Sequence, residues 1–331
     1  MNHEVIQAGI LGIGSSLPEK ILTNSDLEKM VDTSDEWITK RTGISERRIL
    51  DKGTPAYEMG AEAAMRAIED AGISAEDIGL IIAATISPDY MFPQTACLIQ
   101  GKIGAEKAAA FDLNAACSGF VYAMTVAQQF VSTGYCRYVL IVGCEALSRT
   151  LDWEDRNTCV LFGDAAGAAV VGPVEAGYGI LSSKIAADGK SGRVVTLPCF
   201  YSNEEDDSLR LHENKRVMWM DGGEVFKFAV KAMAQATADV VDSAGLTMDQ
   251  IKLIFPHQAN TRIIEGAMKR LGASTDKVHP IIQKYGNISS ASIPVAIDEA
   301  VKQGKVQKGD NLALVGFGGG LTWASAVVRW F

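Results

Sequence analysis

Cys117 is the residue of this sequence whose position best suits a nucleophile. It lies in the stretch 108–124, where an apolar strand pattern ends and a helical pattern runs from Phe120 to Val131. At the start of a helix, unpaired N–H groups and the positive end of the helix dipole stabilise a thiolate, and the same backbone can hold an oxyanion. The position therefore predicts a nucleophilic cysteine, with a buried structural cysteine as the alternative.

His257 and Asn287 are the polar residues that could assist such a nucleophile. His257 directly follows the apolar run 253–256, and Asn287 stands where a second helix is predicted to begin. A neutral histidine and an amide can both donate hydrogen bonds to a carbonyl oxygen that gains negative charge. The alternatives are a histidine that is only a satisfied polar side chain and an asparagine that caps a helix or forms a turn.

The glycine-rich segment 316–323 could bring backbone N–H groups close to a ligand. Its glycines follow an apolar strand pattern, and a residue without a side chain lets the main chain approach a bound group. A tight turn between paired strands explains the same pattern. No G-x-G-x-x-G motif follows a strand and no G-x-x-x-x-G-K-S/T motif occurs, so a nucleotide-phosphate loop has no support.

The elements that must position these residues follow an α/β pattern, because short β-branched runs alternate with helical stretches. Two parts of the chain are similar to each other. The stretch 71–82 matches the stretch 244–255 at an offset of 173, and the strands that end at Gly143 and Gly316 share this offset. The sequence therefore indicates a duplication.

Between those matches, the stretches that end at Gly134 and Gly304 are related by an offset of 170, and at this offset Asn287 aligns with Cys117. Two such halves, residues 1–174 and 175–331, are expected to pack face to face with pseudo-twofold symmetry. That packing would bring the cysteine, the histidine and the asparagine into one cleft.

The composition sets further limits. With 331 residues, 47% of them hydrophobic, the chain can bury a large core, and a net charge of −9 makes nucleic acid an improbable partner. Its six cysteines are scattered singly, which disfavours zinc sites and disulfides. No apolar run approaches the roughly 18 residues of a membrane helix, so we expect a cytoplasmic protein. Residues 188–221 have no counterpart in the first half and are predicted to be a surface excursion.

Seven motifs make nearly the whole chain resemble the condensing enzymes of the thiolase superfamily, most closely the β-ketoacyl-acyl-carrier-protein synthase III family. They are TSDEWI at 33–38, RTGI at 41–44, NAACSGF at 114–120, FGDAAGA at 162–168, PHQAN at 256–260, YGN at 285–287 and FGGGLTW at 317–323. Degradative thiolases have a second cysteine near the C-terminus, and elongating synthases have a second histidine where this chain has Asn287. The resemblance implies a thiolase-like αβαβα layered fold.

The resemblance also implies an initiating condensing enzyme of type II fatty-acid synthesis. Cys117 would attack a short acyl-CoA and become acylated, while the N–H groups of Cys117 and Gly319 hold the oxyanion. His257 and Asn287 would then donate hydrogen bonds to the thioester carbonyl of malonyl-acyl carrier protein as CO2 leaves. The enolate would attack the acyl-cysteine and give a 3-oxoacyl-acyl carrier protein. No cofactor or metal is implied, since the coenzyme A thioester is a substrate.

Residues for binding coenzyme A and the acyl group follow from the resemblance alone. Trp37 and Arg156 would sandwich the adenine, Arg41 would meet the phosphates, and Asn260 would belong to the same site. A partly buried tryptophan and ordinary solvated arginines are the alternatives. The residues implied for the acyl pocket are Phe92, Leu161 and Phe162. Phe92 would reach across a dimer interface into the partner's pocket, which implies a homodimer.

Docking of the acidic carrier protein requires a cationic surface on an enzyme of net charge −9. Arg262 and Lys269 are seven positions apart and share one face of a predicted helix, Arg270 adds to them, and Lys227 is included by the resemblance. An ordinary solvated helix face is the alternative.

Two other functions stay open for the sequence. A thioester hydrolase or simple acyltransferase would share the cysteine chemistry, but an asparagine beside a histidine favours enolate stabilisation over activation of water. A catalytically silent, carrier-protein-binding subunit is disfavoured by an intact Cys117, His257 and Asn287. The acyl starter, straight or branched, is not determined.

Overall fold

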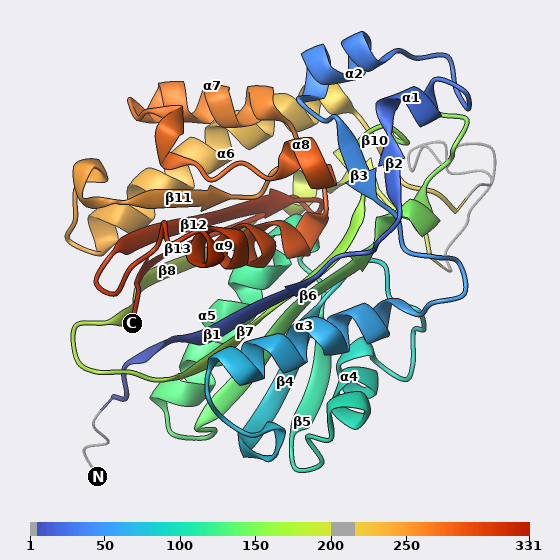
Figure 1. The fold of residues 1–331 in the computed structure, drawn as a ribbon. Coiled ribbons are helices and arrows are strands. Elements are labelled where there is room, and N and C mark those ends of the chain that lie inside the picture. The colour runs from blue at the N-terminus through green and yellow to red at the C-terminus, as the bar shows by residue number, and fades with distance from the viewer. Residues whose placement is uncertain (1–4, 200–215) are drawn as a thin grey trace.

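The computed structural model describes residues 5–199 and 216–331, which form alternating layers of helices and sheets (Figure 1). Two sheets are stacked with helices between them and on both outer faces, so the predicted αβαβα layered α/β fold is confirmed. The first sheet has the order β1 (Ala8–Ser16), β7 (Asp164–Pro173), β6 (Tyr138–Ala146), β4 (Ile78–Ala84), β5 (Ala109–Leu113). The second has the order β11 (Leu253–Pro256), β12 (Asn311–Gly318), β13 (Thr322–Arg329), β8 (Gly179–Ala187).

The middle layer consists of α5 (Gly119–Ser132) and α9 (Ser292–Lys302), each of which contacts strands of both sheets. Phe120 on α5 and Ile297 on α9 are fully buried in the core between the sheets. A helix that faces a sheet on two sides must be apolar around most of its circumference, and both of these sequences are. Burial of this apolar surface, worth about 25 cal/mol per Å², fixes the two helices that follow the candidate site residues.

The outer layers cover the remaining face of each sheet. Helices α3 (Ala56–Asp70) and α4 (Thr95–Ile103) pack on the first sheet, and α6 (Gly222–Ser243) and α7 (Thr261–Leu271) pack on the second (Figure 1). Each buries one apolar stripe and leaves its polar residues outside, as expected for a surface helix. The charged residues of α6 and α7 therefore lie on the molecular surface.

The strand register brings the candidate site to one edge of both sheets. β4 pairs in parallel with β5 and β6 in the first sheet, and β11 pairs in parallel with β12 in the second. Carboxyl ends of parallel strands meet at a common edge, where ligands bind in open α/β sheets. The turn after β5 leads to Cys117, and His257 directly follows β11.

The two halves correspond at an offset of 173 where their central helices begin. The turns in question are η2 (Ala116–Ser118), before α5, and η9 (Ser289–Ala291), before α9. Cys117 therefore corresponds to Ser290. The predicted alignment of Cys117 with Asn287 was wrong, because α9 begins three positions later than an offset of 170 requires. The counterpart of Asn287 is Asn114.

Reciprocal glycine contacts join the two halves. A Cβ atom at Gly143 of β6 would lie 2.6 Å from the carbonyl oxygen of Ser290, and one at Gly316 of β12 would lie 2.8 Å from Cα of Ser118. Each strand thus touches the turn of the opposite half, and only glycine permits this approach. The boundary predicted at 174/175 falls between β7 and β8, and the division there stays a prediction.

Residues 200–215 of the predicted excursion, which include the acidic stretch 204–207, lie outside the described residues. Short elements complete the described part of the chain. They are α1 (Asn24–Leu27), α2 (Asp35–Thr42), α8 (Ile282–Tyr285), β2 (Ile21–Thr23), β3 (Glu46–Arg48), β9 (Val195–Thr196), β10 (Trp219–Met220) and the 3₁₀ turns η1 (Ala75–Asp77), η3 (Leu147–Thr150), η4 (Gly189–Val194), η7 (Met248–Gln250) and η8 (Thr275–Lys277). In the part of the chain that the structure describes, no helix has the length and apolar character needed to span a bilayer.

Candidate active site

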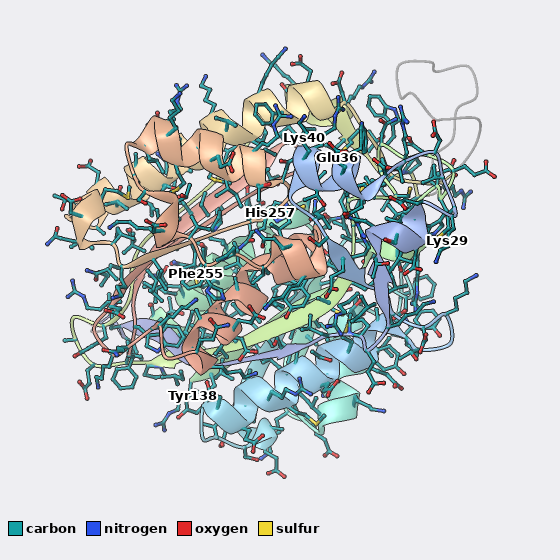
Figure 2. All side chains as sticks on the ribbon, turned by 45° about the horizontal axis from the view of Figure 1, so that its top comes forward. Lys29, Glu36, Lys40, Tyr138, Phe255 and His257 are labelled. Carbon is teal, nitrogen blue, oxygen red and sulfur yellow. The ribbon has the colours of Figure 1, made fainter. Side chains whose placement is uncertain are left out.

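A cavity of about 1680 Å³ lies at the shared edge of the two sheets. Cys117, His257 and Asn287 all line it, although they come from η2, from the end of β11 and from the turn before η9. Figure 2 shows His257 in the interior of the molecule, with Glu36 and Lys40 of α2 at the periphery. The structure therefore brings together the three residues that the sequence predicted to share one cleft.

The turn that carries Cys117 is strained and tightly packed. Ala116 has a positive φ of 47°, which is unfavourable for a residue with a Cβ atom, and its N–H donates to Oδ1 of Asn114 at 3.3 Å. A Cβ at Gly318 would lie only 2.6 Å from the backbone nitrogen of Cys117. The glycine-rich segment 316–323, called the glycine loop below, therefore packs directly against the main chain of Cys117.

Hydrogen bonds hold the glycine loop to the same turn. The Ser118 hydroxyl donates to Ala115 O at 2.7 Å and lies 2.9 Å from Oγ1 of Thr322, which is itself 3.1 Å from Gly319 O. Gly319, the predicted second oxyanion donor, and Cys117 both line the cavity. These contacts fix the two backbone segments relative to each other, as preorganised oxyanion donors require.

The surroundings of Cys117 shift the pKa of its thiol in opposite directions. Burial raises the pKa of its thiol to about 12, and this outweighs the side chain of Ser289, which lowers it. Burial therefore opposes the stabilisation of a thiolate that the sequence predicts for Cys117, which lies in η2 directly before α5. The thiolate stays a prediction.

His257 is held as a neutral imidazole. Its backbone N–H donates to Val315 O at 2.7 Å, its Nδ1 lies 3.1 Å from the Ser292 hydroxyl, and the Phe317 ring packs edge-on at 5.1 Å. Burial lowers its pKa from 6.5 to about 3. When the Ser292 hydroxyl donates to Nδ1, the ring carries its proton on Nε2, the tautomer that can donate a hydrogen bond into the cavity.

The main chain and one side-chain atom of Asn287 are fully engaged. Its N–H donates to Leu161 O at 2.8 Å, and its carbonyl accepts from Gly163 N at 3.0 Å. The side-chain Oδ1 accepts from Ser289 N at 2.9 Å. This bond orients the amide so that Nδ2, a donor, is the atom left for the cavity.

Trp37 stacks with both predicted partner arginines. The guanidinium carbon of Arg41 lies 5.0 Å from the ring centroid, and that of Arg156 lies 5.4 Å from it. Arg156 is also bound to Asp32, to the carbonyl oxygen at 2.9 Å and to the carboxylate at 3.4 Å, and it does not line the cavity. An adenine ring would have to displace Arg156 from Trp37 before the predicted sandwich could form.

Asn260 has a structural part in the same region. Its Nδ2 donates to Arg41 O at 2.9 Å, and its Oδ1 accepts from Arg262 N at 2.9 Å, which caps α7. These bonds join α2, which carries Trp37, to the loop after His257. The side chain lines the cavity, but both of its polar atoms are already engaged.

The residues predicted for the acyl pocket separate into two groups. Leu161 and Phe162 line the cavity, and Phe162 forms an isolated bridge with Asn287. Phe92 is 82% exposed and does not line the cavity of its own chain. Its location on the surface, beside the exposed Tyr90 and Met91, is the one that a contact with a second chain would need.

The predicted docking residues are exposed on α6 and α7. Arg262 and Lys227 line the cavity mouth, and Lys269 and Arg270 lie in the last turn of α7. Lys227 is bound to Glu224 at 2.7 Å, and this hydrogen bond raises its pKa. Glu224 therefore neutralises part of the positive charge of Lys227.

Sequence reasoning missed several cavity residues. Asn114 and Ser289 are the counterparts of Asn287 and Ala116 at the offset of 173, so a position-by-position comparison at that offset would have found them. Residues 195–199 and 217–220 also line the cavity, so the prediction of a surface excursion was wrong for these residues. No local pattern in that segment indicates the buried contact.

The predicted absence of a metal and a cofactor stays a prediction. Within residues 5–199 and 216–331 no cluster of three or more His, Cys, Asp or Glu side chains is arranged to hold a metal ion.

The fold and the cavity together define a class of protein: a condensing enzyme of the thiolase fold, with a cysteine nucleophile and two uncharged hydrogen-bond donors around one cavity. The family model for 3-oxoacyl-[acyl-carrier-protein (ACP)] synthase III matches residues 111–189, and the model for its C-terminal part matches residues 241–330. The chain therefore belongs to the 3-oxoacyl-[acyl-carrier-protein] synthase III family. It is an acyltransferase, the initiating condensing enzyme of fatty-acid synthesis.

Individual relatives are similar to this chain over almost their whole length. The chain is 55% identical to the beta-ketoacyl-[acyl-carrier-protein] synthase III of Caldanaerobacter subterraneus, covering 99% of both chains, and 51% identical to that of Clostridioides difficile, covering 98% of both. Among solved structures, the Aquifex aeolicus enzyme superposes with a TM-score of 0.91 at 44% identity, covering 98% of this chain and 100% of that one. The Thermus thermophilus enzyme gives 0.92 at 44% identity, covering 98% and 99%.

Proposed function

We propose that this chain condenses a short acyl-CoA with malonyl-acyl carrier protein through an acyl-Cys117 intermediate, releasing coenzyme A and CO2 and forming a 3-oxoacyl-acyl carrier protein. The observation that carries the proposal is the cavity in which Cys117, His257 and Asn287 meet, although the cysteine lies far from the other two along the chain. Such a set of one nucleophile and two neutral donors suits thioester exchange followed by enolate stabilisation.

In the first half-reaction the sulfur of Cys117 attacks the thioester carbonyl carbon, and the bond to the coenzyme A sulfur breaks. The N–H groups of Cys117 and Gly319 hold the oxyanion, and one such donor contributes roughly 3–4 kcal/mol in well-studied enzymes. The contacts between the glycine loop and the cysteine turn support this assignment, since they keep both N–H groups in place before substrate arrives.

In the second half-reaction the donors act on the malonyl thioester. His257 and Asn287 donate to its carbonyl oxygen, so that loss of CO2 leaves a stabilised enolate, which attacks the acyl-cysteine. Neither donor needs to remove a proton, and the low pKa of His257 keeps the imidazole neutral for this role. A hydrolase would require a base that activates water, and a histidine with a pKa of about 3 is a poor one.

Substrate binding is assigned to the surfaces around the cavity mouth. Trp37, Arg41, Arg156 and Asn260 would bind coenzyme A, with Arg156 moving aside for the adenine. The exposed cations Arg262, Lys269, Arg270 and Lys227 would receive the acidic carrier protein. Phe92 would close the acyl pocket of a second copy, so the working enzyme would be a homodimer. A cytoplasmic location agrees with these small-molecule and carrier-protein substrates.

Intact-protein mass spectrometry after incubation with acyl-CoA tests the proposal. The wild type and Cys199→Ser, which removes the exposed cysteine, should each gain one acyl group on Cys117, whereas Cys117→Ala should gain none. Labelled malonyl-acyl carrier protein should then release CO2 and discharge the acyl group. An unmodified wild type, or a label on another cysteine, would contradict the acyl-Cys117 intermediate. Hydrolysis of acyl-CoA without condensation would favour the hydrolase.

A further inference from the structure

Gln258 is a buried amide beside His257 that the proposed mechanism does not use. Its two chain neighbours, His257 and Ala259, line the cavity, but Gln258 does not, and its exposed fraction is 0%. It therefore has no access to a substrate in the cavity. Burial of an amide is costly unless its polar atoms find partners. What Gln258 does in the fold follows from the groups that its amide binds.

The Gln258 amide forms three hydrogen bonds with the main chain of one segment, residues 279–282. Its Nε2 donates to the carbonyl oxygen of His279 at 2.8 Å. Its Oε1 accepts from the N–H of Ile281 at 2.9 Å and from that of Ile282 at 3.1 Å, which uses both lone pairs of the oxygen. An apolar side chain in this place would leave three buried main-chain groups without this partner.

These bonds continue a strand pairing past the end of β11. Ile254 of β11 forms a parallel bridge with Val278. Two residues after Val278 comes Pro280, which has no N–H group to donate, and the chain then turns into α8. The side chain of Gln258 has the donor and the acceptor of a peptide unit. It therefore takes the place of the main chain where the two segments separate.

Gln258 also caps the first turn of α8. The first N–H groups of a helix have no partner within it, and a polar side chain at the N-cap usually accepts from them. The N-cap of α8 is Ile281, which forms no such bond. Gln258, 23 positions earlier in the chain, supplies the acceptor instead. The start of α8 is therefore fastened to the residue that follows His257.

The end of α8 leads directly to Asn287. The helix ends at Tyr285, and only Gly286, with a positive φ of 65°, separates it from the asparagine. This link is closely packed, because a Cβ atom at Gly286 would lie 2.7 Å from the carbonyl oxygen of Leu161. The same oxygen accepts from the N–H of Asn287 at 2.8 Å. A displacement of α8 would therefore displace Asn287 as well.

We propose that Gln258 is a positioning residue that sets the place of Asn287 relative to His257, so that both donors reach one thioester carbonyl oxygen of malonyl-acyl carrier protein. The inference rests on the proposed function, since it concerns the second half-reaction. Hydrogen bonds to Val315 and Ser292 already hold His257. The contacts of Gln258 therefore act mainly on Asn287, and Gln258 itself touches no reacting atom.

Gln258→Met removes the three hydrogen bonds with a side chain of similar length. We expect release of labelled CO2 from malonyl-acyl carrier protein, by enzyme acylated beforehand, to fall about 10–10²-fold, because a misplacement of about 1 Å can cost this much. Acylation of Cys117 by acyl-CoA in single-turnover quenched flow should stay close to the wild-type rate. That half-reaction is proposed to use the N–H groups of Cys117 and Gly319 instead.

Steady-state kinetics separate positioning from support of the docking surface. Helix α7 begins at Thr261, three positions after Gln258, so a displaced α7 is the competing explanation. Misplaced donors weaken an interaction made in the transition state, so Gln258→Met should lower kcat and leave KM for malonyl-acyl carrier protein unchanged. A raised KM with wild-type kcat would contradict the positioning role and place the effect on α7.

A double variant tests whether Gln258 acts through Asn287. Asn287→Ala has already lost the amide that Gln258 is proposed to place. Adding Gln258→Met to it should therefore slow CO2 release little further, since the two changes affect one interaction. Losses that multiply would show that Gln258 acts elsewhere, as a general structural role would.

The control is Asn311→Leu, which removes another amide that joins two segments. Its Nδ2 donates to Gln250 O at 3.1 Å and its Oδ1 accepts from Arg329 Nε at 3.0 Å, at the start of β12 and away from the cavity. CO2 release by this variant should stay close to the wild-type rate, even where urea denaturation shows a loss of stability similar to that of Gln258→Met.

Two results would overturn the positioning role: wild-type CO2 release by Gln258→Met, or equal losses in acylation and CO2 release. If Gln258→Met does not fold, Gln258→Asn decides by the same measurements, because its shorter amide cannot keep all three bonds. Failure of the wild type to release CO2 from malonyl-acyl carrier protein would overturn the proposed function instead.

Discussion

At the scale of single residues, the site depends on backbone positions that few side chains tolerate. Ala116 and Ser289 occupy corresponding places in the two halves, and both have a φ of 47°. Their N–H groups donate to the side chains of Asn114 and Asn287, respectively. The duplicated asparagine therefore holds a strained turn in each half. In one half the next residue is Cys117, and in the other it is a serine.

Gly318→Ala tests how closely the glycine loop must approach this turn. The added Cβ would lie 2.6 Å from the Cys117 nitrogen, which forces the two segments apart. We expect acylation by acyl-CoA to fall about 10²–10³-fold, the loss that follows removal of one oxyanion donor. Gly101→Ala, where nothing lies within 4 Å of the new Cβ, should acylate normally. Wild-type acylation by Gly318→Ala would show that the approach is not required.

At the scale of elements, α9 is fastened by a charged cluster away from the cavity. Glu299 of α9 accepts from the Tyr285 hydroxyl at 2.7 Å and lies 3.2 Å from His279 Nε2 and 3.5 Å from Lys284. The hydrogen bond with His279, then the one with Tyr285, lower the pKa of Glu299 from 4.5 to about 2. Because α9 follows Asn287, this cluster supports the second half of the site.

The sign of the pKa shift predicts a pH dependence of stability. A lowered folded-state pKa means that the Glu299 contribution is complete above about pH 4.5 and is lost as the pH falls toward 2. We expect Glu299→Gln to cost about 1–2 kcal/mol of unfolding free energy at pH 7, discounted for partial exposure, and progressively less at pH 4 and 3. Urea denaturation across this range measures it. A cost that does not change with pH would contradict the assignment.

Helix α7 is the element proposed to receive the carrier protein. Arg262→Glu with Lys269→Glu should raise KM for malonyl-acyl carrier protein roughly tenfold or more, less so at high salt, and leave acylation by acyl-CoA unchanged. The control pair Lys107→Glu with Lys252→Glu changes the same charge at the amino ends of β5 and β11, opposite the cavity. Equal effects of the α7 pair on both half-reactions would refute docking there.

At the scale of the whole molecule, an apolar patch remains uncovered in the single chain. Tyr90, Met91 and Phe92 are adjacent, and their exposed fractions are 54%, 56% and 82%. Exposed aromatic and Met side chains are typical of the core of a protein interface. The patch supports the proposed homodimer, in which Phe92 would be buried.

Sedimentation velocity tests this proposal. The wild type should sediment as a dimer, and Phe92→Asp should shift the population toward monomer, because the interface would then have to bury an unpaired charge. Val5→Asp, which places the same charge at a residue that is 78% exposed elsewhere, should stay dimeric. A monomeric wild type, or a Phe92→Asp variant as dimeric as the wild type, would contradict the interface.

The sequence by itself determined the layered fold class and the three residues that meet in the cavity. These depend on local patterns: the alternation of strand and helix periods, the cysteine between a strand and a helix, and the glycines after β12. The sequence also indicated the duplication, since similar stretches recur at an offset of 173. Each of these signals lies within a few neighbouring residues, so it can be read along the chain.

Only the tertiary structure decided the charge states and the contacts between halves. Burial raises the pKa of Cys117, against the thiolate expected from the helix terminus, and lowers the pKa of His257. The counterpart of Cys117, the stacking of Arg156 on Trp37 and the hydrogen bond between Ser290 and Glu145 also appear only in three dimensions. Desolvation and cross-chain packing depend on what surrounds a residue in space, and that is set by segments distant in the sequence.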